Sequence, residues 1–193
     1  KKEERVIAFM KDFGKNLGLE TIEDEVGNVI IKKPATEGME NRTTIVMQSH
    51  LDMVHQKNGD TVFDFDTQGI EMVVEGDWVK AKGTTLGADN GLGVATIMAI
   101  LESTDIQHPA IEALFTIDEE TGMTGAMGLK GGLLTGAILL NLDTEEDDEI
   151  GVGCAGGIDV TATRTYEEEE TPEFKIGYKI SVKGLQGGHS GMQ

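Results

Sequence analysis

Three segments, each followed within three residues by a histidine or acidic side chain, constrain the fold of this chain most strongly. Residues 43–47, 111–117 and 138–142 consist mainly of apolar and β-branched residues. Strands of this kind are buried on both faces, as in parallel sheets, and the segments between them are long enough to form helices. The sequence therefore predicts an α/β fold with a sheet that helices cover on both faces.

Four further elements follow from the spacing of apolar residues. Residues 6–17 repeat them at three- and four-residue steps, which predicts an amphipathic helix ending near Gly18. Residues 29–31 predict a short strand, and residues 72–81, with a Glu-Gly-Asp turn, predict an edge hairpin. Residues 91–101 are apolar almost all round, so we expect a helix buried in the core.

The pattern of apolar and polar residues changes after Gly157. Residues 174–182 alternate apolar and polar side chains, which predicts a strand with one face in water. We therefore place a domain boundary near residue 157, with domains at 1–157 and 158–193, the second incomplete. The chain begins without methionine and stops at Gln193 after a glycine-rich loop, so we expect it to be part of a longer protein.

The net charge of -19 and the pI of about 4.4 argue against a nucleic-acid partner, because phosphate binding needs clustered Lys and Arg. A metal site or a small cationic or zwitterionic substrate suits this charge, although acidity that merely keeps the protein soluble explains it equally well. Cys154 is the sole cysteine, which excludes an internal disulfide and favours a reducing compartment. With no apolar run near the length of a membrane span, we expect a cytoplasmic protein.

Polar side chains that can bind metal follow the predicted strands. They are His50, Asp52, Asp89, Glu119, Glu120 and Asp143. Taken singly, a histidine at a strand end is usually a hydrogen-bonded loop residue, and paired acids are usually surface residues. Together they would meet at one edge of the sheet, beyond the carboxyl ends of its strands, where such folds bind ligands. Divalent metals take nitrogen and oxygen ligands of this kind, so the set predicts a metal-dependent hydrolase.

Other motifs fail on spacing. Residues 143–154 start like a calcium loop, but the glycine position holds Asp148 and the twelfth position holds Cys154. The sequence has neither a His-Glu-x-x-His helix nor a Gly-x-Ser-x-Gly elbow. The strand-end set therefore remains the main candidate.

Five segments together resemble the bacterial aminoacyl-histidine dipeptidases. They are residues 49–54 (SHLDMV), 83–91 (GTTLGADNG), 118–123 (DEETGM), 141–143 (NLD) and 153–157 (GCAGG). These enzymes are lidded di-zinc peptidases, like carboxypeptidase G, aminoacylase and carnosinase. The resemblance covers nearly the whole chain and implies a zinc-peptidase-like catalytic domain over 1–157, with a mixed, mainly parallel sheet. Residues 158–193 would begin an α+β lid or dimerisation domain.

The resemblance implies two Zn²⁺ ions, for which Co²⁺ or Mn²⁺ can substitute. Asp89 would bridge the ions, and His50 and Asp143 would complete one site. Glu120 would bind the other ion together with a histidine beyond Gln193. The resemblance also implies a cis peptide bond between Asp89 and Asn90.

Catalytic roles follow from the same resemblance. Glu119 would be the general base for a metal-bridging water that attacks the peptide carbonyl, and Asp52 would orient the imidazole of His50. His189, in residues 187–191 (GGHSG), would help to bind the substrate. His55 and His108 match no family ligand, and we expect both to be surface or loop residues.

The function implied is a zinc-dependent dipeptidase for unblocked dipeptides, with Xaa-His preferred, acting as a homodimer at full length. An aminoacylase or carboxypeptidase of the same superfamily is an alternative, which Asp rather than Glu at position 143 disfavours. A non-catalytic acidic binding module is an alternative of another class. Because one implied metal ligand lies outside these 193 residues, we expect them to have weak or no activity alone.

Overall fold

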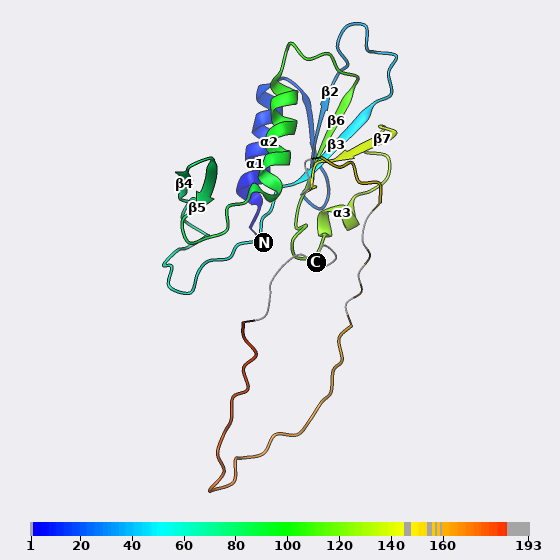
Figure 1. Cartoon of the computed structure of the whole chain (residues 1–193). Helices are drawn as coiled ribbons and strands as arrows, with labels where there is room; N and C mark the ends of the chain where they lie inside the picture. The colour runs from blue at the N-terminus through cyan, green and yellow to red at the C-terminus, as the bar shows by residue number, and fades with distance from the viewer. Residues whose placement is uncertain (1, 145–147, 154–155, 157, 159, 185–193) are drawn as a thin grey trace. The chain divides into compact units, whose positions relative to one another are not determined.

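The computed structural model describes residues 2–144, 148–153, 156, 158 and 160–184. Contacts divide the chain into two compact units, Lys1–Asp147 and Asp148–Gln193. All helices and strands among the described residues belong to the first unit (Figure 1). The domain boundary near residue 157 remains a prediction.

The first unit is built on a five-stranded mixed sheet with the order β1-β2-β6-β3-β7. Its strands are β1 (Glu20–Glu23), β2 (Val29–Lys33), β3 (Ile45–His50), β6 (Ile111–Thr116) and β7 (Ile138–Asn141). Strand β3 runs parallel to both β6 and β7, whereas β2 runs antiparallel to β1 and β6. Every residue of β6 is buried, including Glu112, whose carboxylate accepts hydrogen bonds from Thr135 and Gly136. The predicted α/β class with a mixed sheet is confirmed.

Two helices, α1 (Glu4–Asn16) and α2 (Ala88–Glu102), cover one face of this sheet (Figure 1). Met10 of α1 and Ile97 of α2 are fully buried against the sheet. A side chain at Gly14 would collide with Thr21, so α1 approaches the sheet closely at this glycine. None of the helices in the described part of the chain has the length and hydropathy that a membrane crossing requires.

The opposite face of the sheet is covered by the chain around and after the short helix α3 (Thr124–Gly128). Ile30, Val46 and Leu114 form the buried core of this face. The partly buried side chains that pack on it are Ile22, Leu129, Leu133 and Leu134. The second layer is therefore mostly irregular chain rather than a long helix.

Two elements are less buried than predicted. Helix α2 was expected to lie inside the core, but Leu92 is 71% exposed. All four residues of β7 are exposed, since β7 lies at the edge of the sheet and pairs only with β3 among the described residues. Apolar composition identified both elements but not how far each is covered.

The predicted hairpin is confirmed as β4 (Met72–Glu75) and β5 (Trp78–Ala81). The two strands pair antiparallel around a two-residue turn, in which Gly76 has a φ of 62°. They form a separate two-stranded sheet and not an edge of the main sheet.

In the second unit, the strand predicted over residues 174–182 is wrong. The described residues 148–184 contain neither helix nor strand, and Ile176, Tyr178 and Ile180 are exposed. A strand needs a neighbour for its backbone hydrogen bonds and its apolar face, and none of the described residues supplies one.

Candidate metal centre

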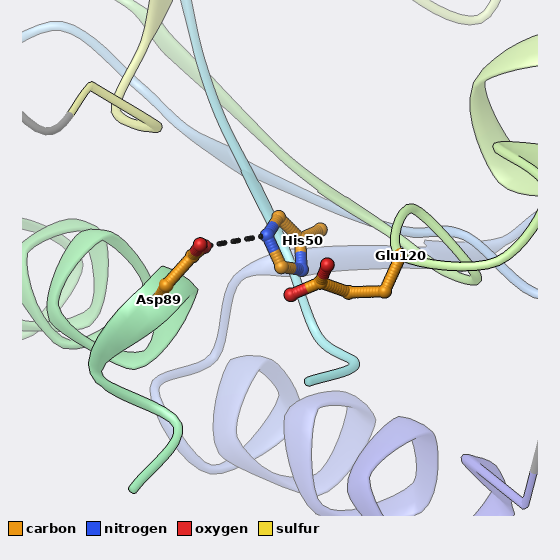
Figure 2. A group of neighbouring side chains, drawn as sticks. All are labelled: His50, Asp89 and Glu120. Carbon is orange, nitrogen blue, oxygen red and sulfur yellow. Dashed lines mark hydrogen bonds and ion pairs between the residues drawn. The ribbon is translucent and has the colours of Figure 1, made fainter. Parts of the chain in front are cut away.

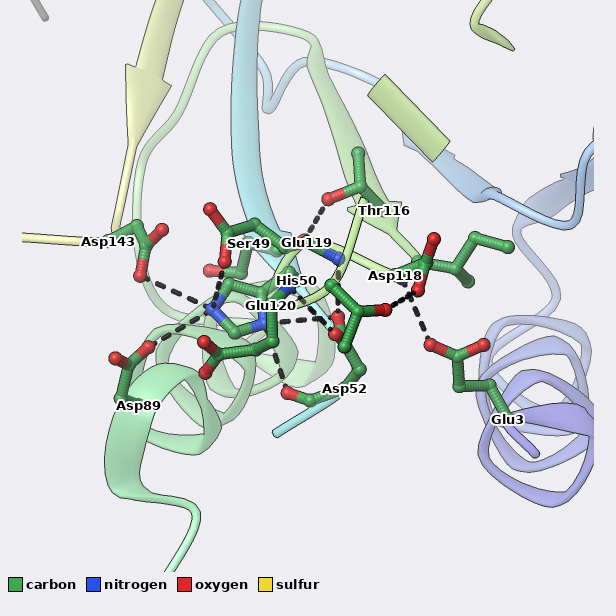
Figure 3. A network of polar contacts seen from close by, with 12 residues as sticks. Glu3, Ser49, His50, Asp52, Asp89, Thr116, Asp118, Glu119, Glu120 and Asp143 are labelled. Carbon is green, nitrogen blue, oxygen red and sulfur yellow. Dashed lines mark hydrogen bonds and ion pairs between the residues drawn. The ribbon is translucent and has the colours of Figure 1, made fainter. Parts of the chain in front are cut away.

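The parallel strands deliver the predicted site residues to one edge of the sheet. His50 ends β3 opposite Thr116, the last residue of β6, and the backbone N–H of Leu51 extends this ladder to the Thr116 carbonyl at 2.9 Å. On the other side of β3, the N–H of Leu142 donates to the Gln48 carbonyl at 2.9 Å, just before Asp143. The side chains that follow the three strands therefore meet, as Figure 3 shows.

Asp89 reaches this edge from the start of α2. Asp89 and Asn90 have non-helical backbone angles, so regular helix begins after them, in agreement with the prediction of a helix from residue 91. The peptide bond between the two residues is cis, as the resemblance implies. Gly87, with a φ of 82°, turns the chain into this segment.

His50 is the centre of the cluster and is only 1% exposed. Its Nε2 atom lies 3.0 Å from Asp89 Oδ1, 3.5 Å from Asp143 Oδ1 and 3.9 Å from Glu119 Oε2. Figure 2 shows that Asp89 and Glu120 flank the imidazole from different elements. His50, Asp89 and Glu120 each offer one possible metal-ligand atom, and these three atoms lie within 4.8 Å of one another.

Asp52 holds the other side of the imidazole. Its Oδ1 atom lies 3.3 Å from His50 Nδ1, and its backbone oxygen lies 3.0 Å from the same atom. The two carboxylate oxygens of Asp52 also accept hydrogen bonds from the backbone N–H groups of Glu119 and Glu120, both at 3.0 Å. One carboxylate therefore orients the histidine and the pair of glutamates.

The chain around the two glutamates is tightly bonded. Asp118 has a φ of 53°, a left-handed conformation that a hydrogen-bonding Asp tolerates. Its carboxylate accepts hydrogen bonds from the hydroxyls of Thr121 and Thr124, and its backbone N–H donates to Glu3 Oε1 at 2.9 Å. Glu3 had no local signal in the sequence, because the contact joins positions 115 residues apart.

The charges of the cluster favour a cation at its centre. Burial lowers the pKa of His50, but hydrogen bonds to Asp143 and Asp52 outweigh it and raise that pKa to about 11. Burial raises the pKa of Glu119 and Glu120, and the charge of Asp89 adds to the rise for Glu120. The carboxylates thus hold a positive charge on the imidazole, which a bound metal ion would replace.

These donors fit a divalent metal. An imidazole nitrogen and carboxylate oxygens are ligands that zinc and similar ions bind, and Asp52 supplies the partner that a metal-binding histidine needs on its second nitrogen. Asp143 Oδ1, 3.5 Å from His50 Nε2, is a further donor. The chemistry and spacing of the described residues therefore match a metal centre.

The remaining histidines and the cysteine divide into three cases. His55 is exposed and contacts the ring of Phe65, as expected for a surface residue. His108 lies in a loop, as predicted, but not at the surface: it is 4% exposed at the opposite end of β6 from the cluster. Its Nδ1 atom lies 2.7 Å from the Pro109 carbonyl oxygen, and its backbone bonds the hydroxyl of Thr36, a distant contact that its sequence neighbours do not signal. His189 and Cys154 lie outside the described residues.

A His/Asp/Glu cluster beyond the carboxyl ends of parallel strands is the kind of site at which α/β folds bind ligands, and its donors are of the type that divalent metals take. No family model matches the sequence. The chain is 49% identical to the cytosol non-specific dipeptidase of Escherichia coli (strain K12) over 189 residues, which cover 98% of the chain and 39% of that protein.

Solved structures agree with this relationship. The crystal structure of aminoacylhistidine dipeptidase from Vibrio alginolyticus matches with a TM-score of 0.75 and 52% identity, covering 76% of this chain and 30% of that one. Aminopeptidase PepT from Bacillus cereus matches with a TM-score of 0.62 and 28% identity, and the match covers 75% of this chain and 39% of that one. The resemblance to the aminoacyl-histidine dipeptidases is thus confirmed in sequence and fold, over the two fifths or less of their length that the chain spans.

Proposed function

We propose that this chain carries most of the metal centre of a zinc-dependent dipeptidase that hydrolyses unblocked dipeptides, with Xaa-His preferred. The observation that carries the proposal is the placement of Glu119. Its carboxylate lies beside the donor cluster, 3.9 Å from His50 Nε2, which is farther than Asp89 at 3.0 Å and Asp143 at 3.5 Å. A carboxylate beside a metal centre is suited to proton transfer.

We assign the ligands as the resemblance implies. Asp89, which shares one donor group with His50 and Glu120, would be shared by two zinc ions. His50 and Asp143 would complete one site, and Glu120 would serve the other together with a histidine beyond residue 193. The contacts of Asp89 and Asp143 with His50 Nε2, at 3.0 and 3.5 Å, support the first of these sites.

Bound zinc would lower the pKa of water and stabilise the negative charge that develops on the scissile carbonyl oxygen. Glu119 would accept the proton of the attacking water on its carboxylate and later donate it to the leaving amine. Burial raises the pKa of Glu119, which makes the carboxylate a stronger base. The hydrogen bond from its own N–H to Asp52 would fix the backbone from which the side chain acts.

The substrate class and setting belong to the same proposal. The named relatives are a dipeptidase, an aminoacylhistidine dipeptidase and an aminopeptidase, which supports a small peptide with a free amino group as substrate. We further propose a homodimer at full length, with His189 contacting the substrate. The name of the Escherichia coli relative supports a cytoplasmic location.

A hydrolysis panel tests the proposed activity. The full-length protein, loaded with zinc, is incubated with β-Ala-His, Leu-His and N-acetyl amino acids, and the released amino acids are quantified. We expect cleavage of the free dipeptides and none of the acetylated compounds. Cleavage of the acetylated compounds alone would support the aminoacylase alternative, and zinc binding without any hydrolysis would support a non-catalytic binding module.

A further inference from the structure

The segment that carries Glu119 and Glu120 is a closed loop between β6 and α3. Its ends, Ile117 and Gly125, are joined by a hydrogen bond from the Gly125 N–H to the Ile117 carbonyl at 3.2 Å. Inside the loop, the N–H of Met123 bonds the Asp118 carbonyl at 2.5 Å. The position of both glutamates therefore depends on what holds the base of this loop.

The side chain of Asn28 bonds both ends of the loop. Its Oδ1 atom accepts a hydrogen bond from the N–H of Ile117 at 3.3 Å, and its Nδ2 atom donates to the carbonyl of Gly125 at 2.9 Å. One carboxamide thus bonds both ends of the loop. Asn28 lies just before β2 in the sequence, far from the loop, and is completely buried.

Asp24 fixes the orientation of the Asn28 carboxamide. Asp24 Oδ2 accepts from Asn28 Nδ2 at 2.7 Å, and Asp24 Oδ1 accepts from the Asn28 backbone N–H at 2.8 Å. The amide nitrogen therefore faces two acceptors and the amide oxygen faces a donor, so a flipped amide would lose these bonds.

Close packing at the end of the loop leaves no room for a side chain at Gly125. A Cβ atom at Gly125 would lie 2.6 Å from the Ile117 carbonyl oxygen and would also collide with Asn28 Oδ1. Glycine is therefore required where the loop closes onto Asn28. A displaced carboxamide would shift the loop as a unit.

We infer that Asn28 is a positioning residue for the Glu119–Glu120 pair. Its carboxamide sets the base of the loop so that the backbone of both glutamates reaches Asp52 and their carboxylates face the metal cluster. The inference rests on the proposed function for the roles of Glu119 and Glu120. It assigns the position of these groups to a side chain that itself touches neither metal nor substrate.

Two variants separate the contacts that Asn28 makes. Asn28→Asp keeps the shape and the acceptor for the Ile117 N–H, but it removes the donor to Gly125 and places a carboxylate against Asp24. Asn28→Ala leaves the N–H of Ile117 and the carbonyl of Gly125 without this partner in a buried place. Thr36→Val is the control, because Thr36 Oγ1 bonds the backbone of His108 at the opposite end of the sheet.

The full-length, zinc-loaded variants are compared in kcat and KM for a dipeptide that the wild type cleaves, in zinc affinity by chelator competition, and in amide hydrogen exchange. We expect kcat to fall about 10- to 100-fold in both Asn28 variants with KM little changed, because a misplaced base lowers the rate more than binding. We also expect weaker zinc binding and faster exchange across residues 117–125. Thr36→Val should match the wild type in kcat and KM, in zinc affinity and in exchange across residues 117–125.

A folded Asn28→Asp protein with wild-type kcat and wild-type exchange in residues 117–125 would overturn the inference. Loss of folding in both Asn28 variants would also overturn it, because Asn28 would then be a general scaffold residue. If the wild type hydrolyses no peptide, the proposed function fails, and exchange and zinc affinity still decide the role of Asn28.

Discussion

The Nδ1 atom of His50 lies 3.3 Å from Oδ1 of Asp52, while the Nε2 atom of the same ring faces Asp89 at 3.0 Å (Figure 3). The ring is thus held from one side and presented to the carboxylate cluster on the other. Burial raises the pKa of Asp52, but the hydrogen bond with His50 and those from the backbone N–H groups of Glu120 and Glu119 outweigh it and lower that pKa to about 2.

Asp52→Asn should weaken zinc binding about 10- to 100-fold, the usual effect of losing a carboxylate behind a metal-binding histidine. The carboxamide cannot accept hydrogen bonds on both of its polar atoms, so one of the two glutamate N–H groups also loses its acceptor. Competition with a chelator measures the affinity. Asp66→Asn, at an exposed aspartate bonded to Lys2, is the matched control and should bind zinc like the wild type. Equal affinities in all three proteins would disprove the orienting role.

Metal-free protein should lose stability as the pH rises above neutrality. The pKa of His50 is raised from 6.5 to about 11, so the folded state binds a proton that the unfolded state releases. The resulting stabilisation is complete below the unfolded value of 6.5 and is lost as the pH rises through about 11. Asp52 acts in the opposite sense, because its pKa is lowered on folding. Its contribution to the free energy of unfolding is present above pH 3.8 and is lost as the pH falls through about 2.

Urea unfolding in the presence of a chelator, at several pH values between about 6 and 10, measures the first of these effects. We expect the free energy of unfolding to fall with pH in the wild type and to change much less in His50→Gln. A wild-type stability that rises over this range would contradict the assigned proton on His50.

Gly93→Ala should disturb both the fold and the metal centre. A Cβ atom at this position would lie 2.5 Å from the Leu142 carbonyl oxygen and from Ser49 Oγ, and it would collide with Asn90. Overpacking of this kind costs about 1–3 kcal/mol, and it would push Leu142, and with it Asp143, away from His50. Thermal unfolding and zinc titration measure the two effects.

Gly91→Ala, in the same helix, is the control for that substitution. Apart from the adjacent residues and the backbone of the helix itself, no described atom lies within 4 Å of a Cβ at Gly91, and alanine favours helix over glycine by about 0.5–1 kcal/mol. We therefore expect equal or higher stability and unchanged zinc affinity. Destabilisation of both variants to the same extent would show that helix propensity, and not the contact at Gly93, decides the outcome.

The sheet and its functional edge could be predicted because the strands carry their own signals. The apolar run of β6 ends at the Asp-Glu-Glu segment, and β3 ends at His50, so parallel pairing was sufficient to bring their acids together. The exposure of Leu92 could not be predicted, because apolar composition indicates that a helix face can be buried and not that another part of the chain covers it.

The supporting residues were missed for a different reason. Asn28 and Glu3 act through hydrogen bonds to backbone groups of residues 117, 118 and 125. Every residue type carries such backbone groups, so the sequence does not indicate which of them a side chain will bond. Gly93 resembled an ordinary helix residue until its distance from Leu142 was known. Tertiary contacts of this kind depend on how distant segments pack, which periodicity and local motifs do not encode.

Zinc content and turnover, measured side by side in the full-length wild type and in Glu119→Ala, test most directly whether Glu119 transfers protons while other residues bind the metal. Because Glu119 lies beside the donor group formed by His50, Asp89 and Glu120, we expect both proteins to bind two zinc ions and only the wild type to cleave dipeptides. A wild type that binds no zinc, or a Glu119→Ala protein that keeps wild-type turnover, would contradict it.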